Sequence, residues 1–202
     1  GHDDGMHFSN CAGLLRVEHC QFQGLMDDPI NVHGTSVKII RKGPGNQLLC
    51  RFMHAQSIGM EWARPGDSVG MIDHLTMQTI ALGQVSSFSP VNETDFILGF
   101  SASLPDQLAT EDGLENLSWT PDLVIRHCRF GSNRARGLLI STPGTVRVED
   151  NSFESSGSAI LIAGDANYWF ESGAVKDVLI RHNNFLSPCL GSLYGGCEAI
   201  LS

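Results

Sequence analysis

The 202-residue sequence has few positive charges and no long apolar segment. It contains 13 Lys and Arg against 22 Asp and Glu, for a formal net charge of −9. An acidic chain without basic runs is a poor partner for nucleic acid or for an anionic membrane surface. No apolar run approaches the ~18 residues that a membrane-spanning helix needs, so we expect no membrane insertion.

Several common site motifs are also absent. The sequence has no P-loop, no GxGxxG and no GxSxG, and none of its six cysteines forms a CxxC pair. We therefore predict no nucleotide cofactor and no metal. Cys189 and Cys197 lie in a loop-like stretch, and their spacing leaves open whether they form a disulfide.

Charged residues make up only 17% of the chain and hydrophobic residues 42%, which argues against intrinsic disorder. The chain begins Gly-His-Asp-Asp, without an initiator Met or a signal peptide. We interpret it as a segment of a longer protein, so its own ends do not indicate a cellular location.

One pattern that ends on a phenylalanine occurs four times, at residues 15–22, 123–130, 146–153 and 178–185. Each copy has apolar residues seven and five positions before the Phe, the period of a strand with one buried face. Two positions before the Phe the apolar phase slips, and we expect a bend there. This bend column consists of Cys20, Cys128, Asn151 and Asn183.

An inward Asn in the bend column would bond the exposed backbone of the turn, and stacked copies would form a ladder. Changing Asn151 or Asn183 to Asp should then destabilise the fold by about 1–3 kcal/mol or more.

A second strand type recurs every 22–24 residues along the chain. Its shared inward column is Met6, Ile30, Leu138, Ile160 and Ile200. A period of this length with two or more short strands predicts an all-β fold, a right-handed parallel β-helix, in which each coil buries its apolar positions against its neighbours. A leucine-rich repeat has a similar period, but its spaced leucines and helical segment are absent.

The repeat is interrupted twice. About 85 extra residues separate Phe22 from Phe130, and alternating segments within them are divided by Gly, Pro and Asn turns. We predict an inserted antiparallel β-barrel at residues 37–120, between coils at 1–36 and 121–202. Its expected strands are 37–40, 48–52, 68–72, 75–82 and 95–100. A shorter insertion is the loop 164–172.

The repeat alignment stacks Asp4 on Asp28, and Asp3 on Asp27, about 4.8 Å apart. Arg136, Ser158 and Glu198 continue the Asp4–Asp28 column. Stacked carboxylates repel each other and raise their pKa values, so a repeat selected for stability alone would carry Asn, Thr or Ser there. The alternative interpretation is an Asp-rich turn that caps backbone amides.

Paired carboxylates with shifted pKa values are the apparatus of glycoside hydrolysis. Two further features favour a sugar site. Tyr168 and Trp169 in the inserted loop would stack on a pyranose ring, and Arg134 and Arg136 would bind sugar hydroxyls; simple loop packing and a surface salt bridge are the alternatives. His33 follows the Asp pair and would line the site. The column of His19, His127 and His182 is interpreted as a coil position rather than a metal site.

Four strings closely resemble the bacterial exo-α-1,3-galactosidases of glycoside hydrolase family 110. They are DDPINVHGT at 27–35, NRARGLLISTP at 133–143, residues 158–175 and CEAI at 197–200. The resemblance implies a parallel β-helix with an inserted barrel. It implies an inverting enzyme, without a known metal, that removes terminal α-1,3-linked galactose from oligosaccharides or glycoconjugates, including blood group B-type structures. The family enzymes are much longer and exported, which implies additional coils in the parent protein.

The resemblance assigns catalysis to three positions. Asp27 is predicted to be the general acid, and Asp4 and Asp28 to position and deprotonate water; the residues alone do not decide which Asp is the acid. An inverting site has acid and base carboxyls ~6.5–9.5 Å apart, and we expect this gap here. The remaining candidates, for galactose recognition, are Arg134, Arg136, Asp165, Asn167, Trp169 and Glu171.

Two rival functions remain at this stage. One is a polygalacturonase, another inverting β-helix hydrolase with three Asp residues, which would need more basic subsites than 13 Lys and Arg supply. The other is a non-catalytic β-helix carbohydrate-binding or adhesin module, which has no need of stacked acids.

Overall fold

The computed structural model describes residues 3–186 and 199–202, which form two compact units. The coil unit comprises residues 3–33, 120–163, 174–186 and 199–202, and the barrel unit comprises residues 34–119 and 164–173. Cys189, Cys197 and Glu198 lie outside the described residues. In the described part of the chain, no helix is long and apolar enough to cross a membrane.

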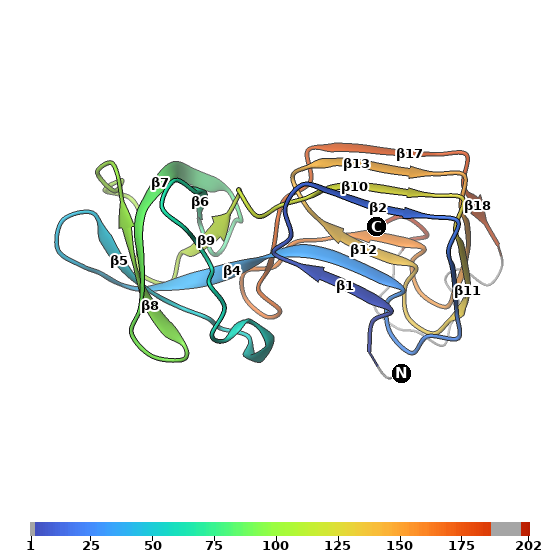
Figure 1. Cartoon of the computed structure of the whole chain (residues 1–202), viewed down its shortest axis with the longest axis horizontal. Coiled ribbons are helices and arrows are strands. Elements are labelled where there is room, and N and C mark those ends of the chain that lie inside the picture. Colours follow the sequence, from blue (N-terminus) through green and yellow to red (C-terminus); the bar gives the residue numbers. More distant parts are fainter. Residues whose placement is uncertain (1–2, 187–198) are drawn as a thin grey trace. The chain divides into compact units, whose positions relative to one another are not determined.

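The coil unit consists of three sheets in which neighbouring strands are parallel. The first contains β2 (Leu14–Glu18), β10 (Asp122–Arg126), β13 (Thr145–Glu149) and β17 (Asp177–Arg181). The second contains β3 (Gln21–Gln23), β11 (Arg129–Asn133), β14 (Ser152–Ser155) and β18 (Asn184–Phe185). The third contains β1 (Met6–Ser9), the first part of β4 (Ile30–Lys42), β12 (Leu138–Ser141) and β15 (Ile160–Ile162). Successive strands of the chain visit the three sheets in turn (Figure 1).

The register of the first two sheets confirms the repeat alignment. Leu15 pairs with Leu123, Leu123 with Val146, and Val146 with Val178. The four phenylalanines stack in one column with ring centroids 5.1, 4.8 and 5.5 Å apart. Because identical rings meet on every coil, a slip of one residue would expose the whole column.

The third sheet follows the predicted inward column except at its last member. Met6 pairs with Ile30, Ile30 with Leu138, and Leu138 with Ile160. The next bridge joins Ile160 to Leu201, so the predicted place of Ile200 is wrong by one residue. The short run at the end of the described chain has no phenylalanine to mark its register.

The bend column forms the expected ladder of side-chain bonds. The Asn151 carboxamide accepts from the Cys128 backbone N–H at 2.9 Å and donates to Ile125 O and to Asn183 Oδ1, both at 3.0 Å. Asn183 donates to Val148 O at 2.8 Å. The inward placement of both asparagines is confirmed.

The residue before each ladder position has a left-handed backbone, with φ between 54° and 55°. These residues are His19, His127, Asp150 and His182. Positive φ at a non-glycine residue is uncommon, so the sharp corner depends on the ladder bonds that follow it.

The barrel unit closes on itself. Strand β4 pairs with β5 (Gln47–Arg51), and the order continues through β8 (Asp95–Phe100), β7 (Thr79–Pro90), β6 (Ser68–Ile72) and β9 (Gly113–Asn116). Strand β9 then pairs antiparallel with β4, and every pairing around the ring is antiparallel. The predicted small antiparallel barrel is confirmed.

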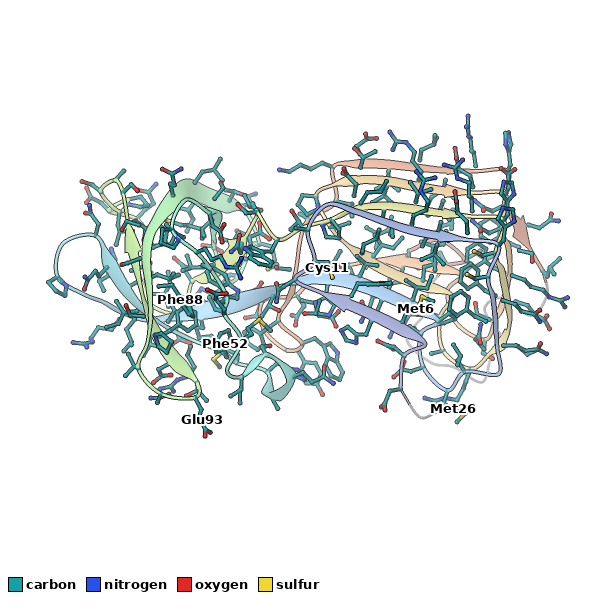
Figure 2. All side chains as sticks on the ribbon, viewed as in Figure 1. Met6, Cys11, Met26, Phe52, Phe88 and Glu93 are labelled. Atoms are coloured by element: carbon teal, nitrogen blue, oxygen red, sulfur yellow. The ribbon has the colours of Figure 1, made fainter. Side chains whose placement is uncertain are left out.

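The barrel core is a cluster of unlike side chains. Trp62 and Phe96 are almost fully buried, and Phe52 and Phe88 pack on Phe96 at 4.8 and 5.0 Å between ring centroids. Figure 2 labels Phe52 and Phe88 among the side chains of the barrel unit, and Glu93 at an exposed turn. The short helix η1 (Ala55–Ser57) precedes Trp62.

Two barrel predictions were wrong in detail. The expected strand 75–82 begins only at Thr79, because the Asp73 carboxylate binds the backbone N–H groups of Leu75 and Thr76 and folds that stretch into a turn. Leu75 is accordingly 79% exposed. Strand β9, which closes the ring, was missed because its Gly-Leu-Glu-Asn sequence has only one apolar side chain.

Candidate active site

The acidic residues gather where the third sheet of the coil unit begins. Because Met6, Ile30 and Leu138 are in register, the residues two positions earlier, Asp4, Asp28 and Arg136, stand one above another. The Asp28 backbone N–H donates to Asp4 Oδ1 at 3.1 Å, and the Arg136 N–H donates to Asp28 Oδ1 at 3.2 Å. The predicted column of Asp4, Asp28 and Arg136 therefore exists.

Small residues allow the coils to approach each other beside this column. A Cβ on Gly5 would lie 2.7 Å from Pro29 O, and a Cβ on Gly137 would lie 2.3 Å from Ala159 O. These contacts are shorter than any side-chain carbon tolerates, so only glycine fits at both positions. The close approach brings the charged groups of successive coils within hydrogen-bonding distance.

Asp28 and Arg136 form a bidentate ion pair. Arg136 Nε lies 2.7 Å from Asp28 Oδ1, and Nη2 lies 2.7 Å from Oδ2. Asp28 is only 1% exposed. Burial raises the pKa of Asp28, Arg136 acts to lower it, and the charges of Asp4 and Asp27 add to the rise. Burial and the neighbouring carboxylates thus favour the protonated form of Asp28, whereas the Arg136 guanidinium favours the ionised form.

Asp27 offers the most accessible carboxylate of the group, with 43% of its side chain exposed against 13% for Asp4. Its Oδ1 lies 3.9 Å from Arg136 Nη2. Asp4, Asp27 and Asp28 each place one oxygen within 4.8 Å of the others. The predicted gap of ~6.5–9.5 Å is a separation between whole carboxyl groups rather than between their nearest oxygens, so it stays a prediction. Asp3 is exposed at the surface.

His7 joins this group, although it is not among the site residues predicted from the sequence. Its Nδ1 lies 3.0 Å from Asp4 Oδ2, and its Nε2 lies 2.6 Å from Nε2 of His33. Strand alternation was the available signal: Met6 and Phe8 pack on the core, which turns His7 to the opposite face. His33, a predicted site residue, is 7% exposed and reaches the acids through His7.

Arg134 lies beside the acids on the same coil unit. It is exposed, and its Nε donates to Met26 O at 2.8 Å, one residue before Asp27. Met26, Arg134 and Glu154 line an open groove of about 330 Å³. The groove has both apolar and polar lining residues, and its hydroxyl and charged groups suit a ligand rich in hydroxyl groups.

The predicted galactose-binding loop belongs to the barrel unit. Asp165 organises it, because its carboxylate accepts from the backbone N–H groups of Asn167, Tyr168, Trp169 and Phe170. Burial alone would raise the pKa of Asp165, but these four bonds lower it below its ordinary value. Asp165 thus has an internal role that the sequence did not predict, and its part in sugar recognition stays a prediction.

The same loop exposes two aromatic rings. Tyr168 is 73% and Trp169 55% exposed, and the Trp169 ring packs 5.4 Å from His54. Asn167 donates to His74 O at 2.8 Å. Glu171, in β16 (Glu171–Ser172), pairs with Thr35 of β4. The exposed rings fit a stacking role, whereas the Asn167 amide is engaged in holding the loop.

Comparison with known proteins agrees with the resemblance found in the sequence. A family model described as GLAA-B beta-barrel domain II matches residues 47–114, inside the barrel unit. Over all 202 residues the chain is 55% identical to "Alpha-1,3-galactosidase B" of Bacteroides thetaiotaomicron, of which it covers 33%. Over its whole length the chain is thus similar to bacterial α-1,3-galactosidases.

Two further relatives are less similar to this chain. It is 39% identical to "Alpha-1,3-galactosidase B" of Bacteroides fragilis, across 98% of the chain and 35% of that protein. It is 40% identical to "Alpha-1,3-galactosidase A" of the same species, across 91% of the chain and 31% of that protein. The chain spans about a third of the length of these relatives.

The acid cluster of this chain also has the chemistry of a possible cation site. Three carboxylate oxygens within 4.8 Å of one another have the hard-donor chemistry that Ca²⁺ and Mg²⁺ prefer. Both oxygens of Asp28, however, already bind the Arg136 guanidinium. The positive charge at this site is thus supplied by a side chain of the protein.

Proposed function

We propose that the protein containing this chain is an exo-acting α-1,3-galactosidase that removes terminal α-1,3-linked galactose from glycans such as blood group B-type structures. The observation that carries the proposal is the cluster of Asp4, Asp27 and Asp28 around Arg136 in a chain 55% identical to a protein with that name. A cluster of carboxylates with one raised pKa is suited to acid–base cleavage of a glycosidic bond.

In this proposal Asp27 is the general acid, because it is the most exposed of the three carboxylates. Asp4 and Asp28 position and deprotonate the attacking water. Arg136 favours the ionised form of Asp28, which a base requires. Inversion of the anomeric configuration rests on the family resemblance alone.

Recognition of galactose is assigned to the polar and aromatic side chains named from the sequence. Arg134 and Arg136 of the coil unit would contact the sugar, His33 would line the site behind His7, and Trp169 would stack on the apolar face of the sugar. Asp165, Asn167 and Glu171 complete the set proposed from the sequence. Exposure of the Trp169 ring supports its role most directly.

The three parallel sheets support a finer description of the fold. We infer that the coils at residues 1–36 and 121–202 are part of a right-handed parallel β-helix, and that residues 37–120 are a barrel inserted between two of its coils. Stacked coils of this kind present long polar grooves that suit a sugar chain.

Substrate selection by the full-length protein tests the activity. We expect hydrolysis of galactosyl-α-1,3-galactose and of 4-nitrophenyl α-galactoside, and no release of uronic acid from polygalacturonate. Cleavage of polygalacturonate instead would identify the rival hydrolase. Binding of α-galactosides without turnover, left unchanged by Asp28→Asn, would identify a binding module.

Two further measurements test the roles. Asp27→Asn should slow the disaccharide by about 10²–10⁴-fold and the nitrophenyl galactoside much less, because nitrophenolate leaves without a proton. Equal losses on both substrates would remove Asp27 from the acid role. Proton NMR of the first product should show β-galactose; initial α-galactose would indicate a covalent intermediate and overturn the three assignments.

A further inference from the structure

Two imidazoles connect the acid cluster to the neighbouring strand. His7 and His33 lie on adjacent parallel strands, β1 and β4, with their side chains on the face opposite the core residues Phe8 and Val32. The rings meet edge to face with centroids 4.8 Å apart. Together with Asp4 they form a continuous series: Asp4 Oδ2 to His7 Nδ1 at 3.0 Å, and His7 Nε2 to His33 Nε2 at 2.6 Å.

The chemistry of the groups fixes where one proton must be. An ionised carboxylate has no hydrogen to give, so the bond to Asp4 requires a proton on His7 Nδ1. The two facing Nε2 atoms need a single proton between them, since two would clash and none would leave no bond. If His33 supplies it, His7 is neutral and held in the Nδ1–H tautomer. The partner of Nε2 thus determines that Nδ1, the nitrogen that faces Asp4, carries the proton.

We propose that His7 is a positioning residue for Asp4 and that His33 acts behind it by fixing its tautomer. This inference rests on the proposed function, in which Asp4 helps to deprotonate water. The Asp28 backbone N–H holds Asp4 Oδ1 and His7 holds Oδ2, so the carboxylate cannot rotate.

Matched substitutions at His7 separate positioning from packing. An Asn amide reaches the place of the imidazole Nδ1–H, whereas Leu fills similar space without a donor. In the full-length protein, His7→Leu should lower kcat by about 10²-fold with little change in KM, and His7→Asn should recover at least about tenfold of that loss. Equal kcat values for the two variants, corrected for folded fraction, would overturn the proposal.

Matched substitutions at His33 make the same comparison between a polar and an apolar side chain. His33→Gln places an amide where Nε2 stood, so it should retain more kcat than His33→Leu, which has no polar atom. The losses should be the same on the nitrophenyl galactoside and on the disaccharide, because Asp4 acts on water and not on the leaving group. A loss confined to the disaccharide would assign the pair to the acid step and contradict the inference.

A second readout does not depend on turnover. Nitrogen-15 NMR of the histidine-labelled protein should show a neutral His7 with its proton on Nδ1, and His33→Leu should abolish that tautomer preference. A His7 protonated on Nε2 alone in the wild type would overturn the proposal. Absence of α-galactosidase activity together with the expected tautomer would overturn the proposed function and leave the Asp4–His7–His33 arrangement standing.

Discussion

The two units solve the problem of burying a sheet in different ways. In the coil unit like residues stack in register, so that Phe22, Phe130 and Phe153 form one column and the asparagines another. In the barrel unit antiparallel strands close a ring around unlike side chains such as Trp62 and Phe96. The sequence of a repeated coil therefore predicts which residues pair, whereas the sequence of a barrel predicts only the positions of its strands. The acidic column is visible because it departs from the repeat.

The largest stability effect should come from charging the coil ladder. Asn151→Asp removes the donor to Ile125 O and sets a carboxylate against Asn183 Oδ1, so we expect a loss of about 3 kcal/mol in the free energy of unfolding. Asn183→Asp should cost less, because it keeps the oxygen that Asn151 uses and loses only the bond to Val148 O. Urea titration measures both.

The barrel unit provides the control for that series. Asn92 sits in an exposed turn where its side-chain oxygen accepts backbone bonds from Thr94 and Asp95 and its amide makes one long bond, 3.5 Å, to Asp95 Oδ2. Because that bond is exposed, Asn92→Asp should change stability by no more than about 1 kcal/mol. If Asn92→Asp lowered the free energy of unfolding as much as Asn151→Asp, the ladder bonds would not explain the loss, and the predicted difference between the two units would be wrong.

A smaller effect should follow from crowding the coils. A Cβ at Gly137 would lie 2.3 Å from Ala159 O and 2.7 Å from Phe153 Cδ1, so Gly137→Ala should destabilise by about 1–3 kcal/mol. At Gly131 of the same unit the nearest atom would be 3.7 Å away, and Gly131→Ala should be nearly neutral. Thermal denaturation of the two variants checks this, and equal shifts would contradict close coil contact beside Arg136.

The smallest effect concerns the loop of the barrel unit. Because the folded pKa of Asp165 is depressed, its contribution to stability is present above its unfolded pKa of ~3.9 and is lost as the pH falls through the lower folded value. Asp165→Asn should cost below about 1 kcal/mol at neutral pH, since the group is largely solvated, and the cost should vanish in acid. Unfolding curves at pH 7 and pH 3 decide it; a cost independent of pH would contradict the role of the carboxylate.

How much the sequence revealed differs between the units for a physical reason. The pairing of Leu123 with Leu15, and of Asp28 with Asp4, followed from aligning repeats, because parallel coils place equivalent residues at one level. Strand β9 could not be predicted by aligning repeats. It is a strand because it pairs with β4 and β6, and its own sequence shows no alternation of apolar and polar residues.

In the candidate site, too, some residues could be predicted from the repeat and others could not. The acids Asp4, Asp27 and Asp28 were identified because they interrupt a column, but His7 was not, since its partner His33 is offset by two residues in register. Asp165 was proposed for sugar recognition because it lies in the loop that resembles the family, while its backbone bonds depend on the loop conformation. Distances between side chains, including the short carboxylate spacing, follow from the fold rather than from residue spacing.

The catalytic role of the acid column is tested by comparing one carboxylate from each unit. Asp28 lies in the acid column, and Asp67 of the barrel unit accepts bonds from Asn116 and Trp119 with no sugar-facing role in this account. In the full-length protein, hydrolysis of galactosyl-α-1,3-galactose per folded molecule should fall by about 10³-fold or more in Asp28→Asn and stay within about twofold of wild type in Asp67→Asn. An Asp28→Asn protein that is folded and still active would contradict the central claim that the coil unit carries the catalytic acids.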